Sequence, residues 1–362
     1  MSALRSVGLA LLAPLIAVVV SVLATTIVIA AAGGAPGDFW SALFSNPLPR
    51  VRVNIVNQTA IIYIAAVAAA IGFRMGLFNI GLEGQYTVAS FAAASFAGAA
   101  YLSGFANVAV ALVIAMAAGA AWAGIAGVLK TTRGVSEVIS TIMLNSIAIT
   151  LVGYLLNRYG VHEGNSVHTK YLEGSSTLTG YTPYDTRDGQ VWALSLLAVV
   201  VGVGFWVLLT KTRFGFDLRA SGQSESAALA SGINPKRMII VSMLLSGAVA
   251  GLIWMPALFG GARSYGTSFQ VGLGFTGIAV ALLGRNRPLG IAFGALLFAF
   301  LTAQSNTLTF NSDIPPSIIQ ITQGVAVLAV VIAYEVVRRY RLRLEQHTVA
   351  RELAPPEKEA SA

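Results

Sequence analysis

Long apolar runs dominate the chain and alternate with short polar segments. At 1.5 Å per residue, seven or more of these runs are long enough to cross a hydrocarbon layer of about 30 Å. They are too long and too continuous for the strands of a β-barrel. The pattern therefore predicts an all-α membrane protein, a polytopic helical bundle of about ten transmembrane helices. The predicted spans are 7–32, 52–72, 76–101, 104–130, 135–157, 191–210, 238–260, 271–284, 288–305 and 316–337.

Composition agrees with this class and excludes several others. Hydrophobic residues make up 56% of the chain and charged residues 10%, whereas soluble domains carry about a quarter charged residues. The chain has no cysteine and three histidines, His162, His168 and His347, all in polar segments. We therefore expect neither a disulfide nor a metal site. The net charge of +8 is scattered over short loops, which argues against a nucleic-acid partner.

The basic residues predict how the chain is oriented in the bilayer. With a cytoplasmic N-terminus, seventeen of the 23 Lys and Arg residues fall in segments on the cytoplasmic side. The positive-inside rule then favours ten spans with both termini in the cytoplasm. Residues 1–343 are expected to form the membrane domain and 344–362 a polar cytoplasmic tail. The loop 211–237 is expected inside and the loop 158–190 outside.

The segment 211–237 is the only long basic stretch between two strongly apolar runs. Its centre, Glu225 to Leu229, is an Ala-rich helix former bracketed by Gly222 and Gly232. We expect it to present a small surface helix to a soluble partner. The loop 158–190 is polar and about 33 residues long, and structureless loops beyond about 15 residues tend to be functional or disordered. We expect it to dock an external protein.

Two glycine-interrupted stretches, 76–85 and 272–284, each have the pattern of a broken helix. With the predicted topology, spans 2–5 and 7–10 enter the membrane from opposite sides and could form inverted repeats. Interrupted segments in matching halves point to a transport pathway. Elsewhere, Gly247 and Gly251 lie four residues apart, as do Gly290 and Gly294, and such pairs predict close helix packing.

Glu83 is the acidic residue that lies well inside an apolar run. A carboxylate near the bilayer centre costs several kcal/mol, so Glu83 should face the protein interior and have a partner. It could form a polar wall of the pathway. Alternatively, it could lock the helix break by accepting hydrogen bonds from backbone amides freed around Gly81 and Gly84. The residue types leave both interpretations open.

Neutral amides accompany Glu83. Asn79 and Gln85 flank it, and Asn145 lies in the middle of another span. Amides suit a neutral cargo rich in hydroxyls or carrying a base, although an interhelical hydrogen bond is the simpler role for Asn145. Phe78 and Phe275 could stack on a flat ring or serve only in packing.

Sequence motifs for catalysis are missing. The chain contains no H-E-x-x-H, no G-x-S-x-G and no Gly-Lys pair, so it has no P-loop to hold a nucleotide. We expect a non-catalytic subunit without a resident cofactor, in which any ATP is used by a partner. An ion-coupled carrier normally needs several intramembrane ionisable groups, and Glu83 alone is thin support for one. An intramembrane enzyme is the least favoured class.

Several of these stretches resemble the inner-membrane permeases of ABC importers, in the ribose and nucleoside branch. The stretch 73–85 is similar to the Asn-Ile-Gly-x-Glu-Gly-Gln signature of the nucleoside group, and 136–145 and 277–284 resemble two further motifs. Residues 219–233 are similar to the segment that couples such permeases to their ATPases. The chain departs from that pattern at Ser224 and Glu225, where the family usually has Asn and Pro. This departure affects the expected geometry of the coupling helix and not its role.

The resemblance implies the partners, the cargo and the location. It implies a bacterial inner-membrane complex of two related permease subunits, two cytoplasmic ATPases and an external substrate-binding protein or lipoprotein. Nucleosides are the implied cargo, with simple sugars or branched-chain amino acids as the alternative. The residues assigned to the substrate path are Phe78, Asn79, Glu83, Gln85, Asn145 and Phe275; those assigned to ATPase coupling are Arg219, Gly222, Glu225, Ala227, Ala228 and Gly232.

Overall fold

The computed structural model describes residues 19–31, 33–311 and, with gaps, 318–339. The predicted tail 344–362, the start of the first span and parts of the last one lie outside the described residues. The chain divides into two compact units. One contains residues 1–44 and 307–362, and the other contains residues 45–306.

The first unit contains the helix Val19–Ala31 and α2 (Pro36–Leu43). The chain turns between them at Gly33, whose φ of +79° favours glycine. Proline at the first position of α2 starts that helix. The indole of Trp40 donates a hydrogen bond to Thr26 Oγ1 at 3.0 Å and ties the two helices together.

The second unit is helical, with one small sheet on a loop. Its short elements are the antiparallel strands β1 (Val161–Glu163) and β2 (Ser166–His168), the 3-10 turns η1 (Gly174–Ser176), η2 (Thr186–Asp188) and η3 (Ala193–Ser195), and the π-helix η4 (Leu258–Ala262). Its α-helices are α3 (Pro49–Arg74), α4 (Leu82–Gly98), α5 (Gly104–Arg133), α6 (Glu137–Tyr159), α7 (Leu196–Lys211), α8 (Arg213–Gln223), α9 (Glu225–Ala230), α10 (Pro235–Gly251), α11 (Met255–Ala257), α12 (Leu273–Leu283) and α13 (Pro288–Asn311), the last of which runs past the unit boundary.

Among the described residues, five helical stretches are long and apolar enough to cross a membrane. They are α3, α5, α6, Ala193–Lys211 and Pro235–Ala262. Shorter apolar helices occur at Val19–Ala31, Leu273–Leu283, Pro288–Gln304 and Gln320–Ala329. The prediction of a helical, multi-pass membrane protein is confirmed, while the count of ten spans stays a prediction.

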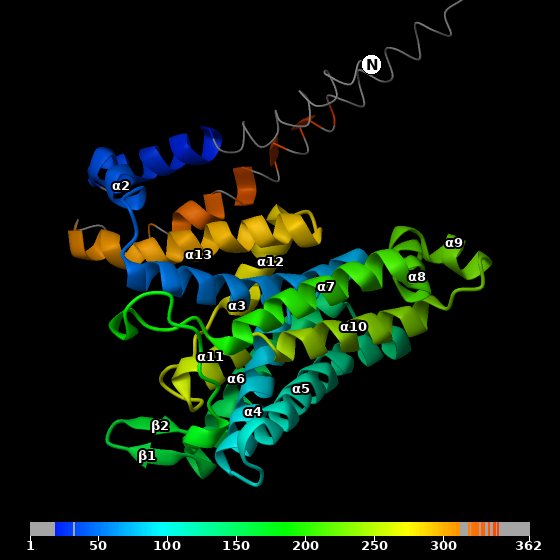
Figure 1. Cartoon of the computed structure of the whole chain (residues 1–362). Helices are drawn as coiled ribbons and strands as arrows, with labels where there is room; N and C mark the ends of the chain where they lie inside the picture. Colours follow the sequence, from blue (N-terminus) through cyan, green and yellow to red (C-terminus); the bar gives the residue numbers. More distant parts are fainter. Residues whose placement is uncertain are drawn as a thin grey trace, which may run out of the picture. The chain divides into compact units, whose positions relative to one another are not determined.

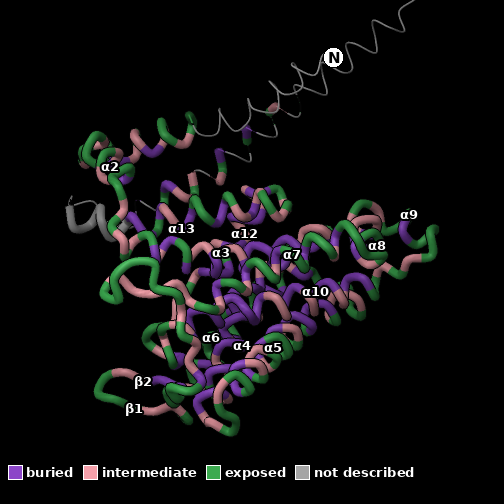
Figure 2. Tube along the Cα trace, viewed as in Figure 1, coloured by how far each residue is buried: buried purple, intermediate pink, exposed green. Residues whose placement is uncertain are grey.

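Helix α3 runs through the core of the second unit (Figures 1 and 2). Its alanine-rich second half is buried on all sides because α7, α10 and α12 pack around it. Small residues also let α10 cross α5 at contact distance, since a Cβ at Gly247 would overlap the carbonyl oxygen of Gly119, and one at Gly251 that of Ala115. The predicted packing role of Gly247 and Gly251 is confirmed.

The loop 158–190 is more ordered than its composition indicates. Strands β1 and β2 pair as a hairpin, and Tyr181 and Val191 form an isolated antiparallel bridge. Backbone pairing thus supplies order that an apolar pattern does not, and docking of an external protein on this loop stays a prediction. In Figure 1 this hairpin lies at the opposite end of the long helices α5 and α10 from α8 and α9.

The segment 211–237 holds two helices. The predicted one is α9, and the additional α8 precedes it. The hydroxyl of Thr212 caps α8 by accepting the Gly215 amide at 3.0 Å, and Gly215, Leu218 and Ser221 form its buried face. Gly222 lies within α8, so it does not bracket α9 as predicted; Ser224 separates the two helices.

Candidate polar site at two helix breaks

The first predicted break is present between α3 and α4. Helix α3 ends in a Schellman motif, in which Gly76 has a φ of +76° and the Leu77 amide donates to the Gly72 carbonyl at 3.0 Å. The chain then runs without helical structure until Leu82 begins α4. Residues 75–81 therefore have backbone amides and carbonyls that need partners other than those a helix would provide.

The second predicted break lies elsewhere than expected. Residues 273–283 form one uninterrupted helix, α12, and the non-helical chain precedes it, ending at Gly272 with a φ of +88°. Gly274 and Gly277 do not interrupt this helix. Their missing side chains instead allow close approach, of Gly277 to the backbone of Ala65 and of Gly274 to that of Glu83. At 11 residues, α12 is about 16 Å long, roughly half the thickness of the hydrocarbon layer.

The carboxylate of Glu83 joins the two breaks. Oε1 accepts the Gly272 amide at 2.7 Å and the Tyr86 hydroxyl at 2.8 Å, and Oε2 accepts the Gly274 amide at 3.0 Å. Glu83 is only 5% exposed. Its negative charge lies at the amino end of α12, where the helix dipole and unpaired amides favour an anion. The partner expected for this buried carboxylate is therefore a helix terminus.

The amides around Gly81 and Gly84 have other acceptors, contrary to the lock interpretation as first stated. Asn79 Oδ1 accepts the Gly81 amide at 3.0 Å, and Asn145 Oδ1 accepts the Gly84 amide at 2.8 Å. Asn145 also donates to the Ile80 carbonyl at 2.9 Å. The interhelical role weighed for Asn145 is present, since this residue of α6 replaces the helical hydrogen bonds that the break removes.

Asn79 and Gln85 form a buried amide pair, each only 1% exposed. Gln85 Nε2 donates to Asn79 Oδ1 at 3.0 Å, and Asn79 Nδ2 donates to Ser246 Oγ of α10 at 3.0 Å. Ser246 in turn donates to the Ala68 carbonyl of α3 at 2.7 Å. This network ties α3, α4 and α10 together. Ser246 escaped prediction because a single serine in an apolar run gives little signal.

Phe78 and Phe275 lie outside this buried network. Phe78 is 41% exposed and packs against Phe73 in a tilted arrangement, with ring centroids 4.9 Å apart. Phe275 is 52% exposed on α12. The structure thus brings together four of the six residues assigned to the substrate path and leaves the two phenylalanines on the surface of the unit.

Aromatic rings that were not predicted pack beside Glu83. Phe269 contacts Tyr86, Trp254 and Tyr265 with centroids 5.3, 5.1 and 4.5 Å apart. The Tyr86 hydroxyl lies 2.9 Å from the Gln270 carbonyl as well as near Glu83. Burial raises the pKa of the Tyr265 phenol, and the Glu83 carboxylate adds to the rise. Three separated chain segments supply these rings, so no local pattern could have revealed them.

The predicted coupling helix keeps its shape despite the departure at Ser224 and Glu225. Ser224 Oγ caps α9 by accepting the Ala227 amide at 3.3 Å. A Schellman motif ends it, with Gly232 at a φ of +80° and the Ile233 amide donating to Ala228. Ser224, one of the two positions where the chain departs from the pattern, therefore starts this helix.

The six residues assigned to coupling divide into two groups. Glu225, Ala227 and Gly232 are exposed, whereas Arg219, Gly222 and Ala228 are wholly or partly covered. The guanidinium of Arg219 donates to the Leu209 carbonyl of α7. Two exposed apolar side chains were missed, Leu229 on α9 at 66% and Phe216 on α8 at 61%. Exposed apolar groups on short polar helices are typical of docking surfaces.

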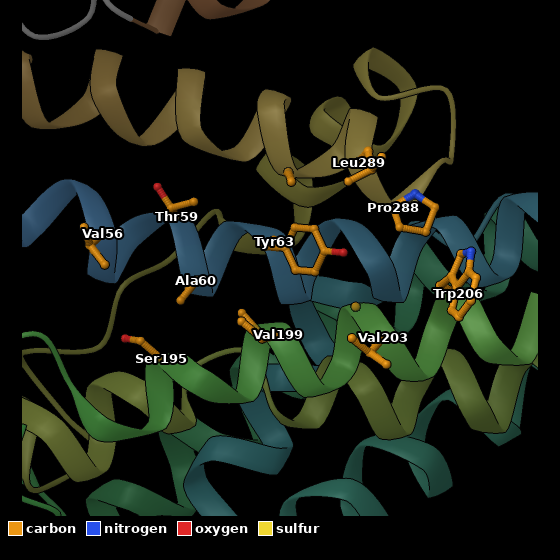
Figure 3. Close-up of a pocket in the computed structure, with 13 residues that line it drawn as sticks. Val56, Thr59, Ala60, Tyr63, Ser195, Val199, Val203, Trp206, Pro288 and Leu289 are labelled. Carbon is orange, nitrogen blue, oxygen red and sulfur yellow. The ribbon is translucent and has the colours of Figure 1, made fainter.

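An apolar groove of about 600 Å³ lies between α3, α7 and the start of α13 (Figure 3). Val199 and Val203 of α7 face Tyr63 of α3 across it, and Leu289 and Trp206 border it. None of the twelve predicted site residues lines this groove. Its walls suit a lipid chain or another helix better than a polar cargo.

The described part of the chain offers no group of three His, Cys, Asp or Glu for a metal ion.

Comparison with known proteins gives one family and several relatives. The family model described as branched-chain amino acid transport system / permease component matches residues 51–334. The guanosine ABC transporter permease protein NupP of Bacillus subtilis (strain 168) is 32% identical, over 90% of this chain and 94% of its own. The nucleoside ABC transporter permease protein NupB of Lactococcus lactis subsp. cremoris (strain MG1363) is 30% identical, over 89% and 91%. The glucose ABC transporter permease protein TsgB13 of Haloferax volcanii is 29% identical, over 85% and 83%.

Proposed function

This chain belongs to the branched-chain amino acid transport system / permease component family, and we propose that it is the membrane-embedded permease subunit of an ATP-driven ABC importer that carries nucleosides. The assignment of nucleosides as the cargo rests on the similarity to guanosine and nucleoside permeases over about nine tenths of the chain. The permease itself supplies a path and a lever, and partner subunits hydrolyse the ATP.

The segment 211–237 is the docking site for a cytoplasmic ATPase. Helix α9 is capped at both ends, and Glu225, Ala227 and Leu229 are exposed while Ala228 is buried. A short rigid helix of this kind can seat in a groove of another subunit. The basic residues of the segment favour its location on the cytoplasmic side.

The rest of the complex follows from the same orientation. The ordered loop 158–190, at the other end of the long helices, receives the external substrate-binding protein or lipoprotein (Figure 1). A second, related permease subunit completes the path, and two ATPases serve the pair. The complex resides in the bacterial inner membrane with both chain termini in the cytoplasm.

The path runs beside the two helix breaks. Helix α3 packs on α12, and α10 packs on α4. These two contacts are counterparts if spans 2 and 7, and spans 3 and 8, are related by an inverted repeat. Asn79, Glu83, Gln85 and Asn145 use their hydrogen-bonding groups within the protein, so they hold the shape of the wall. Phe78 and Phe275 retain exposed faces on which a flat base can stack.

Two other cargoes and one other mechanism compete with this proposal. The glucose permease relative supports a sugar, and the description of the family supports a branched-chain amino acid. An ion-coupled carrier would need a titratable group free to exchange ions during transport. Glu83 instead has both carboxylate oxygens engaged with α12 and Tyr86, which favours the ATP-driven class.

Reconstitution tests the cargo and the energy source together. The chain, its partner permease and the ATPases would be placed in proteoliposomes with the cognate binding protein, and uptake of labelled guanosine measured with and without ATP. We expect uptake that requires ATP and is inhibited by other nucleosides but not by glucose or leucine. Inhibition by glucose or leucine instead would show that the cargo is a sugar or a branched-chain amino acid. Ion-driven uptake by this chain alone would disprove the importer assignment.

A further inference from the structure

The two residues that flank the first break hold opposite ends of α12. Glu83 accepts the Gly272 and Gly274 amides at its amino end. Beyond its other end, in the turn between α12 and α13, the guanidinium of Arg74 donates to the Asn286 carbonyl through Nε at 3.1 Å and Nη2 at 2.8 Å. The dipole of α12 favours the negative charge of Glu83 at its amino end. Helix α12 is thus bracketed by residues only nine positions apart in sequence.

The chain between these residues is itself fixed. Leu77 and Asn79 are buried, and the segment turns back over Gly72, where a Cβ would lie 3.3 Å from the Leu77 carbonyl oxygen. Asn79 accepts the Gly81 amide, and Asn145 donates to the Ile80 carbonyl. The buried Leu77 and Asn79 anchor this segment in the core, so a displacement of Arg74 is transmitted to both ends of α12.

Gly222 of α8 lies against this segment without an intervening side chain. A Cβ at Gly222 would lie 2.5 Å from the Arg74 carbonyl oxygen and 2.8 Å from the Met75 carbonyl carbon. From the other side, a Cβ at Gly76 would lie 3.3 Å from the Gly222 carbonyl oxygen. The backbone of α8 therefore touches the end of α3, at the point where the break begins.

Helix α8 is also held firmly to its neighbours. Gly215 packs so closely on α7 that a Cβ would overlap the Leu208 carbonyl, and Arg219 donates to the Leu209 carbonyl. Ser224 alone separates α8 from α9. Because α9 is short and capped, a force applied to it reaches Gly222, near the end of α8, through Ser224.

We propose that residues 74–83 and α12 move as one rigid piece, and that Gly222 is the contact through which α8 and α9 move it. This inference rests on the proposed importer function and names the positioning residues within it: Gly222 as the contact, with Arg74 and Glu83 as the two holds on α12. Movement at the docking site then displaces the exposed face of α12, including Phe275, without unwinding the break.

A Gly222→Ala variant tests the contact, with Gly204→Ala as its matched control. The added methyl at 222 meets backbone that cannot rotate away, whereas nothing lies within 4 Å of a Cβ at Gly204 on α7. Because the natural chain has no cysteine, a single Phe275→Cys substitution reports on α12. The measurement is the rate of thiol labelling in the reconstituted complex, with and without ATP.

We expect ATP to change the labelling rate several-fold in the Phe275→Cys complex and in its Gly204→Ala version. The Gly222→Ala version should retain the bound ATPase but lose most of this change, with uptake falling about tenfold. If Gly222→Ala shows the full ATP-dependent change, the inference is wrong while the importer assignment stands. Failure of the unmodified chain to bind any ATPase would instead disprove the proposed function.

Arg74→Met provides a second test should Gly222→Ala fail to fold. It removes the hold on the Asn286 carbonyl and keeps the backbone contact of residue 74 with Gly222. The inference predicts that ATP then changes labelling at residue 275 less than at a Phe78→Cys site, because α12 no longer follows the break. Equal changes at both sites, in an assembled complex, would contradict the rigid-piece assignment.

Discussion

Glu83 and Gly274 contact each other in two ways. The Gly274 amide donates to the Glu83 carboxylate at 3.0 Å, and the absent side chain of Gly274 leaves room for the Glu83 backbone. A Cβ at Gly274 would lie 2.5 Å from the Glu83 amide nitrogen and 2.9 Å from its Cα. The hydrogen bond therefore depends on glycine at this position of α12.

Gly274→Ala should weaken the junction between α4 and α12. The methyl must push the two helices apart, and overpacking of this kind costs about 1–3 kcal/mol. We expect a lower unfolding temperature of the purified chain in detergent, measured by intrinsic fluorescence. Gly153→Ala on α6 is the control, because a Cβ there meets nothing within 4 Å. Equal temperatures for both variants would contradict the contact.

Glu83→Gln separates the structural role of this carboxylate from a direct role in transport. Glutamine keeps one acceptor oxygen, but it loses the charge, and its amide NH2 group faces a backbone N–H donor. An unmatched buried donor costs about 1–3 kcal/mol. We expect reduced thermal stability together with measurable uptake, and a larger loss of stability for Glu83→Ala. Unchanged stability with uptake abolished would show that Glu83 acts on the cargo or on a coupled ion.

Asn145→Ala should leave the Gly84 amide and the Ile80 carbonyl without their partner from α6. Both groups are held by this one side chain, so the expected loss is about 1–3 kcal/mol for each group left unpaired. Asn145→Asp keeps an acceptor for the Gly84 amide, but it buries a charge and turns a carboxylate oxygen toward the Ile80 carbonyl, so its loss of stability should be at least as large. The neighbouring Ser146 is exposed, and Ser146→Ala should behave as the unmodified chain in the same unfolding assay.

Leu229→Asp should reduce ATPase binding, since this exposed side chain of α9 is the apolar part of the proposed docking surface. We expect at least a tenfold loss of ATPase in co-purification from membranes. Leu229→Met, which keeps an apolar group of similar volume, should retain binding. Full binding by Leu229→Asp would place the docking surface elsewhere.

Arg219→Ala and Glu225→Ala should each uncouple ATP hydrolysis from uptake without preventing membrane insertion. Arg219 ties α8 to the Leu209 carbonyl of α7, and Glu225 lies exposed in the first turn of α9. The measurement is the ratio of ATP hydrolysed to nucleoside imported, which we expect to rise several-fold. A normal ratio in both variants would count against the lever role of this segment.

Topology can be tested directly because the natural chain has no cysteine. A single Ser226→Cys on α9 should react with a membrane-impermeant thiol reagent in inside-out vesicles only. A single His162→Cys on the β1–β2 hairpin should react in right-side-out cells only. The reverse pattern would place the segment 211–237 outside and remove the basis for ATPase docking.

The sequence by itself determined the class of the protein and the position of most helices. Apolar runs of membrane-spanning length, small residues at helix crossings and basic residues in short loops are local signals, so α3, α5, α6 and α7 fall close to their predicted bounds. The break before α4 and the helix α9 were also predicted, because glycines and helix caps act over a few neighbouring residues.

Only the tertiary structure decided which groups meet. One of the two interpretations of Glu83 gave it the amides near Gly81 and Gly84 as partners, but the amides it accepts come from Gly272 and Gly274, about 190 positions away. The contact of Gly222 with Arg74 and Met75 and the bond from Arg74 to Asn286 are equally remote in sequence. Hydrogen bonds and backbone contacts depend on distances of about 3 Å. Helix packing fixes those distances, and residue order along one chain does not encode them in any local pattern.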